Sequence, residues 1–245
     1  MNRVAIVPAR RALVAYAALT AAKSVLSQPS QGFAARPLRM DTPSEHNAYQ
    51  RKVFDEKSDF FASATATPPA VVPRLQRIAK SCSLESKTTL LDVGTGTGAL
   101  LPFFKESGGD LAQITGVDLS AGMLGFARER FPQARFVQDD VLHFEGGPYD
   151  RVVFNACFGN LYDPVAVLKH VAQKLLSDGG LVVISHPLGR AWLTTLKEKD
   201  PRMVLHDLPG SEELKQMLAQ VPELALEFLE DESDYYCLVL KRQPR

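Results

Sequence analysis

An apolar segment that leads directly into three alternating glycines constrains the fold of this chain more than any other feature. The segment is LLDVGTGTGAL, residues 90–100, and its glycines are Gly94, Gly96 and Gly98. Glycine lets the backbone turn tightly and approach a ligand closely, and a helix that follows offers unpaired N–H donors at its N-terminus. The segment therefore predicts a strand, a ligand-binding turn and a helix, as in doubly wound α/β folds.

Apolar strand-like segments and helix-like segments alternate along the rest of the chain. Further strands are predicted over 114–118, 135–138, 151–155 and 181–185. Helices are predicted over 44–59, 67–80, 121–130 and 164–176, and a turn over 178–180. Alternation of this kind indicates a parallel sheet with helices on both faces. Near the C-terminus, segments 224–229 and 235–240 are joined by a short polar link and predict an antiparallel hairpin at one end of the sheet.

The glycine loop by itself does not identify a ligand, because Gly94, Gly96 and Ala99 also satisfy the dinucleotide fingerprint of NAD enzymes. Acidic residues decide between the alternatives. A carboxylate at Asp92 would face a diphosphate unfavourably, but it suits the cationic amino acid end of S-adenosylmethionine (SAM). Asp118 ends the next predicted strand, 24 residues after Gly94, where an acid can accept both ribose hydroxyls. Asp139 and Asp140 follow the third strand, where an acid can accept from an adenine amino group.

Taken in order, the segments LLDVGTGTG, GVDLSAGML, QDDV, YDRVVFNACFGN and LLSDGGLVVIS resemble the motifs of class I SAM-dependent methyltransferases that act on small molecules. The resemblance covers residues 90–185. It implies a Rossmann-like, seven-stranded, mostly parallel sheet with a C-terminal antiparallel hairpin, and SAM as cofactor. The residues that it implies in cofactor binding are Asp92, Gly94, Thr95, Gly96, Gly98, Asp118, Leu119, Met123, Asp140, Val141 and Asn155. Met123 fits equally well as a core methionine of a helix.

The acceptor of the methyl group is expected beyond the carboxyl ends of the fourth and fifth strands, where open α/β sheets bind ligands. Asn155 and His186 are the candidate catalytic residues. His186 could act as a base or hydrogen-bond the acceptor, or it could only cap its strand. Enzymes that methylate the amino groups of nucleic acid bases have two prolines after such an asparagine, whereas this chain has Ala156 and Cys157. A small-molecule acceptor and direct in-line displacement are therefore favoured, with Cys157 a buried thiol or, alternatively, a nucleophile.

The sequence also contains weaker candidates for acceptor-site residues and is compatible with other functions. Arg190 could pair with an acidic acceptor or with a surface acid, and His143 and His206 have smaller claims. Residues 41–86 contain an aromatic-rich segment that predicts a helical lid over the acceptor, or a helix packed on the sheet edge. Alternative functions are an inactive SAM-binding module that works through a partner, a protein or nucleic-acid methyltransferase, and an NAD-linked oxidoreductase.

Charge is distributed unevenly along the chain. The first 40 residues contain six basic and no acidic residues, a composition typical of organelle transit peptides for mitochondrion or plastid, or of a tail without an address. The predicted organisation is thus a targeting segment over 1–40, the lid over 41–86 and the SAM-binding domain over 87–245. Without the first segment, 22 basic residues face 28 acidic ones, a formal charge of −6, which argues against nucleic acid as a partner.

Neither a membrane-spanning segment nor a metal site is predicted. No stretch of about 18 apolar residues occurs, so we expect a soluble protein without stable membrane insertion. The three cysteines lie far apart and lack metal-ligand spacing, which fits free thiols in a reducing compartment. The sequence carries no signal for an oligomeric state.

Overall fold

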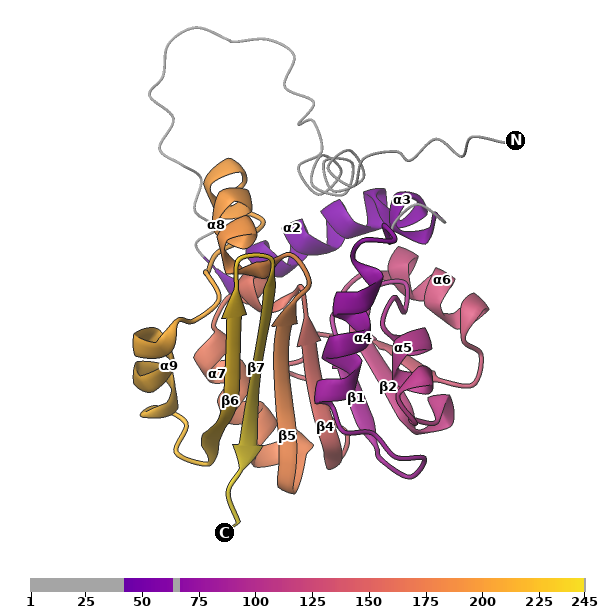
Figure 1. Cartoon of the computed structure of the whole chain (residues 1–245). Helices are drawn as coiled ribbons and strands as arrows, with labels where there is room; N and C mark the ends of the chain where they lie inside the picture. The colour runs from indigo at the N-terminus through magenta and orange to yellow at the C-terminus, as the bar shows by residue number, and fades with distance from the viewer. Residues whose placement is uncertain (1–41, 64–66, 245) are drawn as a thin grey trace, which may run out of the picture.

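The computed structural model describes residues 42–63 and 67–244, and the predicted targeting segment lies outside them. One seven-stranded sheet has the order β3-β2-β1-β4-β5-β7-β6 (Figure 1). The five parallel strands are β1 (Leu90–Val93), β2 (Ile114–Asp118), β3 (Arg135–Gln138), β4 (Tyr149–Asn155) and β5 (Leu176–His186). β6 (Leu224–Glu232) and β7 (Tyr235–Arg242) form the antiparallel hairpin on β5. The predicted fold class is confirmed.

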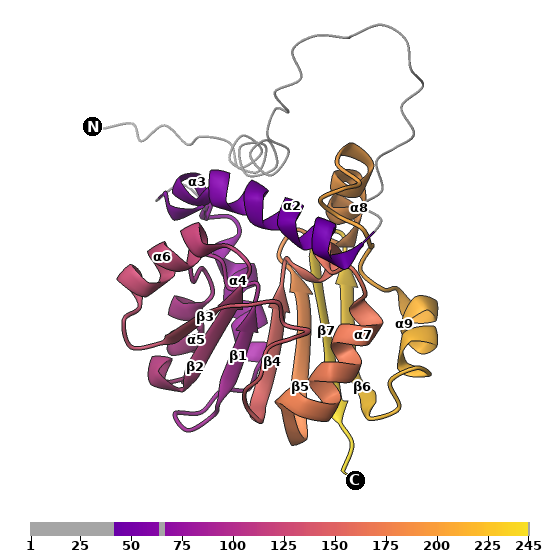
Figure 2. The same ribbon diagram turned by 180° about the vertical axis from the view of Figure 1, so that it is seen from behind.

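Helices cover both faces of the sheet. They are α2 (Pro43–Glu56), α3 (Ser58–Ala62), α4 (Val72–Ser81), α5 (Leu101–Glu106), α6 (Ala121–Arg130), α7 (Pro164–His170), α8 (Gly189–Lys199) and α9 (Ser211–Leu218). α4 and α5 lie on one face, and α7 lies on the other, as the view from behind shows (Figure 2). None of the helices in residues 42–63 and 67–244 is long and apolar enough to cross a membrane.

Two apolar layers, one on each face of the sheet, hold the helices in place. Side chains alternate between the faces along a strand, so Val152 and Phe154 pack in the layer with α7, whereas Val153 packs in the layer with α4 and α5. Because the central strands are buried on both faces, each contains a continuous apolar run, residues 90–91 in β1, 152–154 in β4 and 181–184 in β5. This continuous apolarity is why the sequence predicts these strands well.

The structure differs from the sequence expectations in two places. β5 begins at Leu176, and the predicted turn over 178–180 lies within it, where the pairing with β4 shifts from Tyr149–Leu176 to Arg151–Leu181. α8 and α9 were not predicted. Within each of these short helices, few residues are buried, Leu193 on α8 and Leu214 on α9 among them. A weak local pattern of this kind becomes helical mainly through tertiary packing.

α2 crosses the carboxyl ends of the parallel strands (Figures 1 and 2). Its first turn carries a capping box, in which the Thr42 side chain accepts from the Glu45 amide at 3.2 Å and the Glu45 carboxylate accepts from the Thr42 amide at 3.2 Å. The residues that α2 buries are polar, His46 and Gln50. An amphipathic core helix would bury apolar residues fully, whereas here Val53 and Phe54 are only partly buried against the core and hydrogen bonds supply further contacts.

Candidate functional site

A cavity of about 690 Å³ lies between α2 and the carboxyl ends of the strands, a volume within the range of small-molecule sites. Every residue that the sequence predicts for cofactor binding lines this cavity. They are Asp92, Gly94, Thr95, Gly96, Gly98, Asp118, Leu119, Met123, Asp140, Val141 and Asn155. Residues spread over more than 60 positions of sequence therefore meet at one edge of the sheet, as the carboxyl ends of parallel strands require.

The glycine loop after β1 has two kinds of glycine. Gly94 and Gly96 both have positive φ, +66° and +56°, a backbone conformation that other residues adopt only with strain. A Cβ atom at Gly94 would lie 2.8 Å from the Cβ of Cys157, whereas a Cβ atom at Gly96 would have nothing within 4 Å. The Gly94 amide also donates to the Val117 carbonyl at 2.8 Å. Gly94 thus packs against the protein, and Gly96 faces open space in the cavity.

Asp118, at the end of β2, anchors this loop. Its Oδ2 atom accepts from the Gly96 amide and its Oδ1 atom from the Ser120 amide, both at 2.9 Å. Burial raises the pKa of the Asp118 carboxyl, and these two amide donors act in the opposite direction. Each carboxylate oxygen can accept a second hydrogen bond, so Asp118 can hold the loop and receive a pair of ligand hydroxyls together.

Asp92, at the end of β1, is a buried carboxyl with an exposed fraction of 3%. Burial raises the pKa of Asp92 to about 7, and the nearby Asp118 carboxylate also raises it. A cation bound next to Asp92 would favour its charged form and lower this pKa. The cavity therefore contains a carboxyl whose protonation depends on what lies beside it.

α2 supplies cavity residues that the sequence analysis missed. Asn47 Nδ2 donates to Asp140 Oδ2 at 2.6 Å, while Asp140 Oδ1 accepts from the Leu142 amide at 3.0 Å. Together with Asn47, the residues Pro43 and Gln50 line the cavity from one face of the helix, as does Phe54, which belongs to the aromatic segment predicted to form the lid. The helical spacing of these residues in the sequence could have indicated a common face of one helix. Nothing in the sequence showed what this face contacts.

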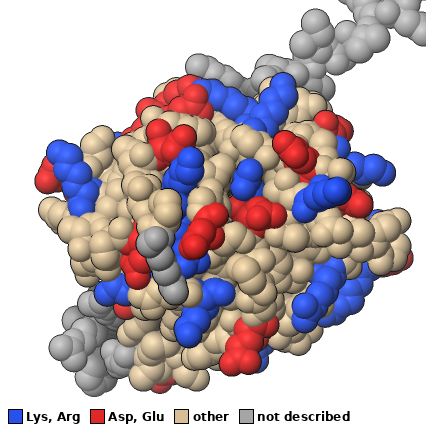
Figure 3. Space-filling view, turned by 90° about the horizontal axis from the view of Figure 1, so that it is seen from below, with Lys and Arg blue, Asp and Glu red and all other residues tan. Residues whose placement is uncertain are grey.

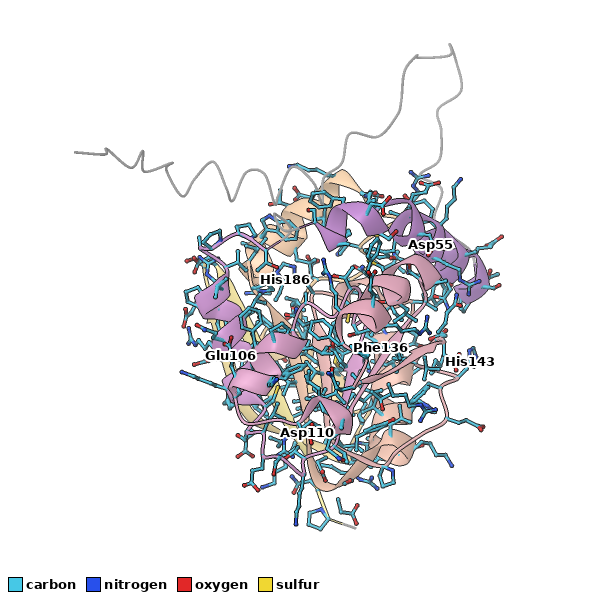
Figure 4. The ribbon with its side chains drawn as sticks, turned by 90° about the vertical axis from the view of Figure 1, so that its right-hand side faces the viewer. Asp55, Glu106, Asp110, Phe136, His143 and His186 are labelled. Atoms are coloured by element: carbon cyan, nitrogen blue, oxygen red, sulfur yellow. The ribbon has the colours of Figure 1, made fainter. Side chains whose placement is uncertain are left out.

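Further buried hydrogen bonds fasten α2 to distant segments. His46 Nε2 donates to the Asn160 carbonyl at 2.6 Å, and burial lowers the pKa of His46, which keeps it neutral. At the other end, Asp55 Oδ1 accepts from Ser120 Oγ at 2.6 Å and from the Gly122 amide at 3.0 Å. Figure 4 shows Asp55 where α2 approaches α6. The helix thus connects the loops that follow several different strands.

The structure separates the two candidate catalytic residues. Asn155 lines the cavity, and its Oδ1 accepts from Ser185 Oγ at 3.1 Å. His186, the next residue after Ser185, is not among the described lining residues, because neighbouring side chains on a strand point to opposite faces. Its ring stacks on Trp192 with the centroids 5.0 Å apart, and its Nδ1 accepts from the Leu188 amide at 3.2 Å (Figure 4).

This placement of His186 predicts an acid-sensitive fold. Burial lowers the pKa of His186 to about 3, so the unfolded chain binds a proton between that pH and the ordinary value of 6.5 while the folded chain does not. Stability should therefore fall as pH decreases below 6.5, by about 1.4 kcal/mol per pH unit. Denaturant unfolding at pH 7 and pH 5 should show a smaller loss for His186→Asn than for the wild type. His143→Asn, at a side chain 75% exposed, is the control, and equal losses in all three proteins would contradict the prediction.

The weaker sequence candidates also lie outside the cavity lining. Arg190 pairs with Asp231 at 2.9 Å, and His206 Nε2 donates to the Tyr162 carbonyl at 3.2 Å. His143 is largely exposed, with Nδ1 3.7 Å from Asp140 Oδ2. Cys157 does line the cavity, but its Sγ donates to the Val93 carbonyl at 3.1 Å and burial raises its pKa well above the ordinary value. This environment supports a buried thiol rather than a nucleophile.

Known proteins similar to this chain define its class. Residues 61–225 match a family described as "Methyltransferase domain". This match covers more than half of the chain, and the cavity residues Asp92, Asp118 and Asp140 fall within it. The chain belongs to the SAM-dependent methyltransferase family, and SAM is the cofactor of that family.

Individual relatives match over about two fifths of the chain. It is 37% identical to a trans-aconitate 2-methyltransferase of Rhodopseudomonas palustris over 97 residues, which are 39% of this chain and 37% of the relative. It is 36% identical to a malonyl-[acyl-carrier protein] O-methyltransferase of Acetivibrio thermocellus over 100 residues, 40% of this chain and 35% of the relative. The chain spans between about a third and a half of the length of the curated relatives that it matches.

Solved structures share the fold over most of the chain. A Burkholderia thailandensis 1,6-didemethyltoxoflavin-N1-methyltransferase, with bound 1,6-didemethyltoxoflavin and S-adenosylhomocysteine (SAH), aligns with a TM-score of 0.63 at 17% identity, over 89% of this chain and 100% of that one. The magnesium protoporphyrin IX methyltransferase of Synechocystis PCC 6803, with bound SAH, aligns with a TM-score of 0.59 at 18% identity, over 81% and 100%. At these identities the similarity shows the fold alone.

Proposed function

We propose that this chain is an enzyme that transfers the methyl group of SAM to a small-molecule acceptor. One observation carries the proposal: a single cavity at the carboxyl edge of the sheet contains all the predicted cofactor residues and Asn155, and α2 lies across it. On the face at the opposite ends of the strands, acidic and basic side chains are interspersed (Figure 3). A surface that binds nucleic acid would gather basic side chains, and the face in this view does not. The described lining of the cavity has five carboxyl groups and one arginine, a composition that favours a small acceptor over a polyanion.

The residues of the cavity fit SAM in charge and in space. Asp118 would accept from the ribose hydroxyls and Asp140 from the adenine amino group, while Asp92 would stabilise the cationic methionine end. The open space at Gly96 lets the loop backbone approach the ligand closely. We therefore assign these residues to cofactor binding, and Asn155 to the part of the cavity where the methyl group meets its acceptor.

The chemistry requires little from the protein beyond orientation and desolvation. SAM supplies a methyl group whose bond to sulfur breaks with both electrons remaining on sulfur, while a lone pair of the acceptor forms the new bond. The described lining contains no histidine or lysine, so a proton displaced from the acceptor would pass to solvent or to a carboxylate of the lining. The geometry gives His186 no access to this proton, and we do not propose it as the base.

We further propose that α2 and α3 form a lid, and that α4 belongs to the body of the domain. α2 and α3 contribute Gln50, Phe54 and Phe61 to the cavity lining, and water exclusion by such a cover favours transfer to the intended acceptor. α4 instead buries Leu75 and Ile78 in the apolar layer on the sheet. The lid thus ends before α4 rather than at residue 86.

Calorimetric titration of the full chain with SAM, SAH and NAD tests the cofactor assignment. We expect SAM and SAH to bind and NAD not to bind. Binding of NAD without SAM would overturn the proposal. Formation of SAH from SAM, followed across a panel of small acceptors, then tests the enzymatic activity, and a protein that binds SAM but transfers the methyl group to none of them would be a binding module.

The affinity for SAM should depend on pH through Asp92. Its carboxyl holds a proton below about pH 7 in the free protein, and a bound cation must expel this proton. Affinity should therefore decrease as pH falls from 8 to 6, by up to about tenfold per unit, with proton release on binding at pH 6. The ligand's own amino group titrates near this range, so the quantity to compare is the proton release in wild type and in Asp92→Asn. Equal release in both proteins would contradict the prediction.

A further inference from the structure

The composition of the cavity restricts the chemical class of the acceptor. We propose that the acceptor is an uncharged, largely apolar molecule that carries an O–H or N–H group, and that Gln50 positions this group. The inference rests on the proposed methyl transfer and adds a substrate class and a positioning residue to it.

Charged side chains in the cavity do not suit an anionic acceptor. The described lining contains five carboxyl groups, those of Asp92, Asp118, Asp139, Asp140 and Asp163. Arg130 is the single lysine or arginine in the described lining, and its Nη2 donates to the Ala62 carbonyl. Recognition of a di- or tricarboxylate requires several cationic donors aimed at it. A trans-aconitate-like acceptor would lack them here and would meet acidic repulsion as well.

Each carboxylate of the cavity already has a role, either in the proposed cofactor binding or in a local hydrogen bond. Asp92, Asp118 and Asp140 are assigned to the cofactor. Asp139 Oδ1 accepts from the Asp140 amide at 2.8 Å, and Asp163 Oδ1 accepts from the Ala166 amide at 2.9 Å as the N-cap of α7. These two carboxylates are engaged in local backbone hydrogen bonds. An uncharged acceptor is therefore the best match to the remaining lining.

Much of that remaining lining is apolar and aromatic. The rings of Phe54 and Phe61 have centroids 6.1 Å apart at an interplanar angle of 49°. Further apolar lining comes from Val72, Leu100, Pro102, Phe103 and Phe131. Aromatic side chains favour flat apolar ligands through stacking and edge contacts. The cavity thus matches an aromatic or similarly apolar acceptor.

Gln50 is a buried polar side chain of this lining, on the same helix as Phe54. Its side-chain nitrogen Nε2 donates to the Met203 carbonyl at 2.6 Å. A carbonyl oxygen can only accept, so the amide nitrogen must face Met203 and the oxygen Oε1 must point the other way. Gln50 is 3% exposed and lines the cavity, and its Oε1 has no partner among the described residues.

An unpaired buried acceptor is unfavourable, and a ligand that brings an O–H or N–H donor to Gln50 Oε1 relieves this cost. Phe54 lies one turn further along α2, so a ring held by Phe54 can present its donor to Gln50. This hydrogen bond involves no proton transfer and positions the acceptor only. Selectivity for donor-bearing acceptors follows, because an analogue without the donor leaves the buried oxygen unpaired.

Binding of three probes to the full chain saturated with SAH tests the proposal. The probes are 2-naphthol, 2-methoxynaphthalene, which lacks the donor, and trans-aconitate. We expect 2-naphthol to bind about three- to tenfold more tightly than 2-methoxynaphthalene, and trans-aconitate not to bind. In Gln50→Met this ratio should approach one while SAH affinity stays within about twofold. If Gln50→Met only disturbed the structure of the cavity, both naphthalene probes would bind more weakly by the same factor, and the ratio of their affinities would stay as in the wild type.

Gln173→Met is the matched control. Gln173 is exposed on the π-helical turn Val171–Leu175 that follows α7, so this variant should leave the ratio as in wild type. The proposal is overturned if trans-aconitate binds as tightly as 2-naphthol, if neither naphthalene binds, or if Gln50→Met retains the preference. Failure of SAH itself to bind would instead overturn the proposed methyl transfer, so the two failures are distinguishable.

Discussion

Replacing Asp118 by alanine should weaken SAM binding by about 100-fold or more, the largest single effect that we expect on the cofactor. The variant would lose two hydrogen bonds to the ribose, and hydrogen bonds to a charged group contribute about 1.5–3 kcal/mol each. Since about 1.4 kcal/mol is a factor of ten in affinity, 100-fold is a conservative expectation. The substitution would also remove the hydrogen bonds from the Gly96 and Ser120 amides to the Asp118 carboxylate, which hold the loop in shape.

Titration calorimetry on folded protein measures this effect, and two other variants serve as references. Asp110→Ala removes a carboxylate that caps a surface turn through the Ala112 amide, on the side of the sheet away from the cavity (Figure 4). It should bind SAM as the wild type does. Asp118→Asn keeps one acceptor oxygen and should fall between the two. Wild-type affinity in a folded Asp118→Ala variant would remove the ribose assignment.

The second large effect should come from Gly96→Ala, which we expect to abolish measurable SAM binding with only a moderate loss of stability. The positive φ at Gly96 makes alanine unfavourable by about 1–2 kcal/mol. No protein atom obstructs the new methyl group, so it would project into the space that the cofactor needs. Thermal unfolding and calorimetry together separate the two consequences.

Gly94→Ala is the matched variant, with a similar φ but a Cβ only 2.8 Å from Cys157. Overpacking should add about 1–3 kcal/mol to its loss of stability. Adding Cys157→Gly should recover part of this loss in Gly94→Ala but none in Gly96→Ala. If Gly96→Ala bound SAM normally, or if the two alanine variants were equally unstable, the distinction between the two glycines would be wrong.

Asp92, Asp118 and Asp140 show why the cofactor half of the cavity was predictable. Each lies at the end of a short apolar strand or directly after it, and strand ends in a parallel sheet share one edge. Local patterns therefore sufficed to bring these residues together. Such local patterns identify which end of the sheet binds a ligand. They do not identify which segment of the chain covers that end.

The direction in which the His186 side chain points could not be predicted from local patterns. Its position at the end of β5 was predicted, but Ser185 is the residue that faces Asn155, and His186 packs on Trp192 instead. A shift of one residue changes the face of the sheet, and this register depends on pairing between β4, β5 and β7. No local feature of the sequence near His186 reveals that pairing.

The sequence alone determined the parallel sheet, the glycine loop and the acids that we propose for the cofactor site, because each is encoded within a few neighbouring residues. Tertiary structure alone decided that α2 covers the cavity and that Gln50, a residue of its lining, has a buried oxygen with no partner among the described residues. These features depend on contacts between remote segments: Asn47 meets Asp140 across 93 positions, and Gln50 meets Met203 across 153. Such contacts form only when the whole chain has folded, since no short segment contains both partners.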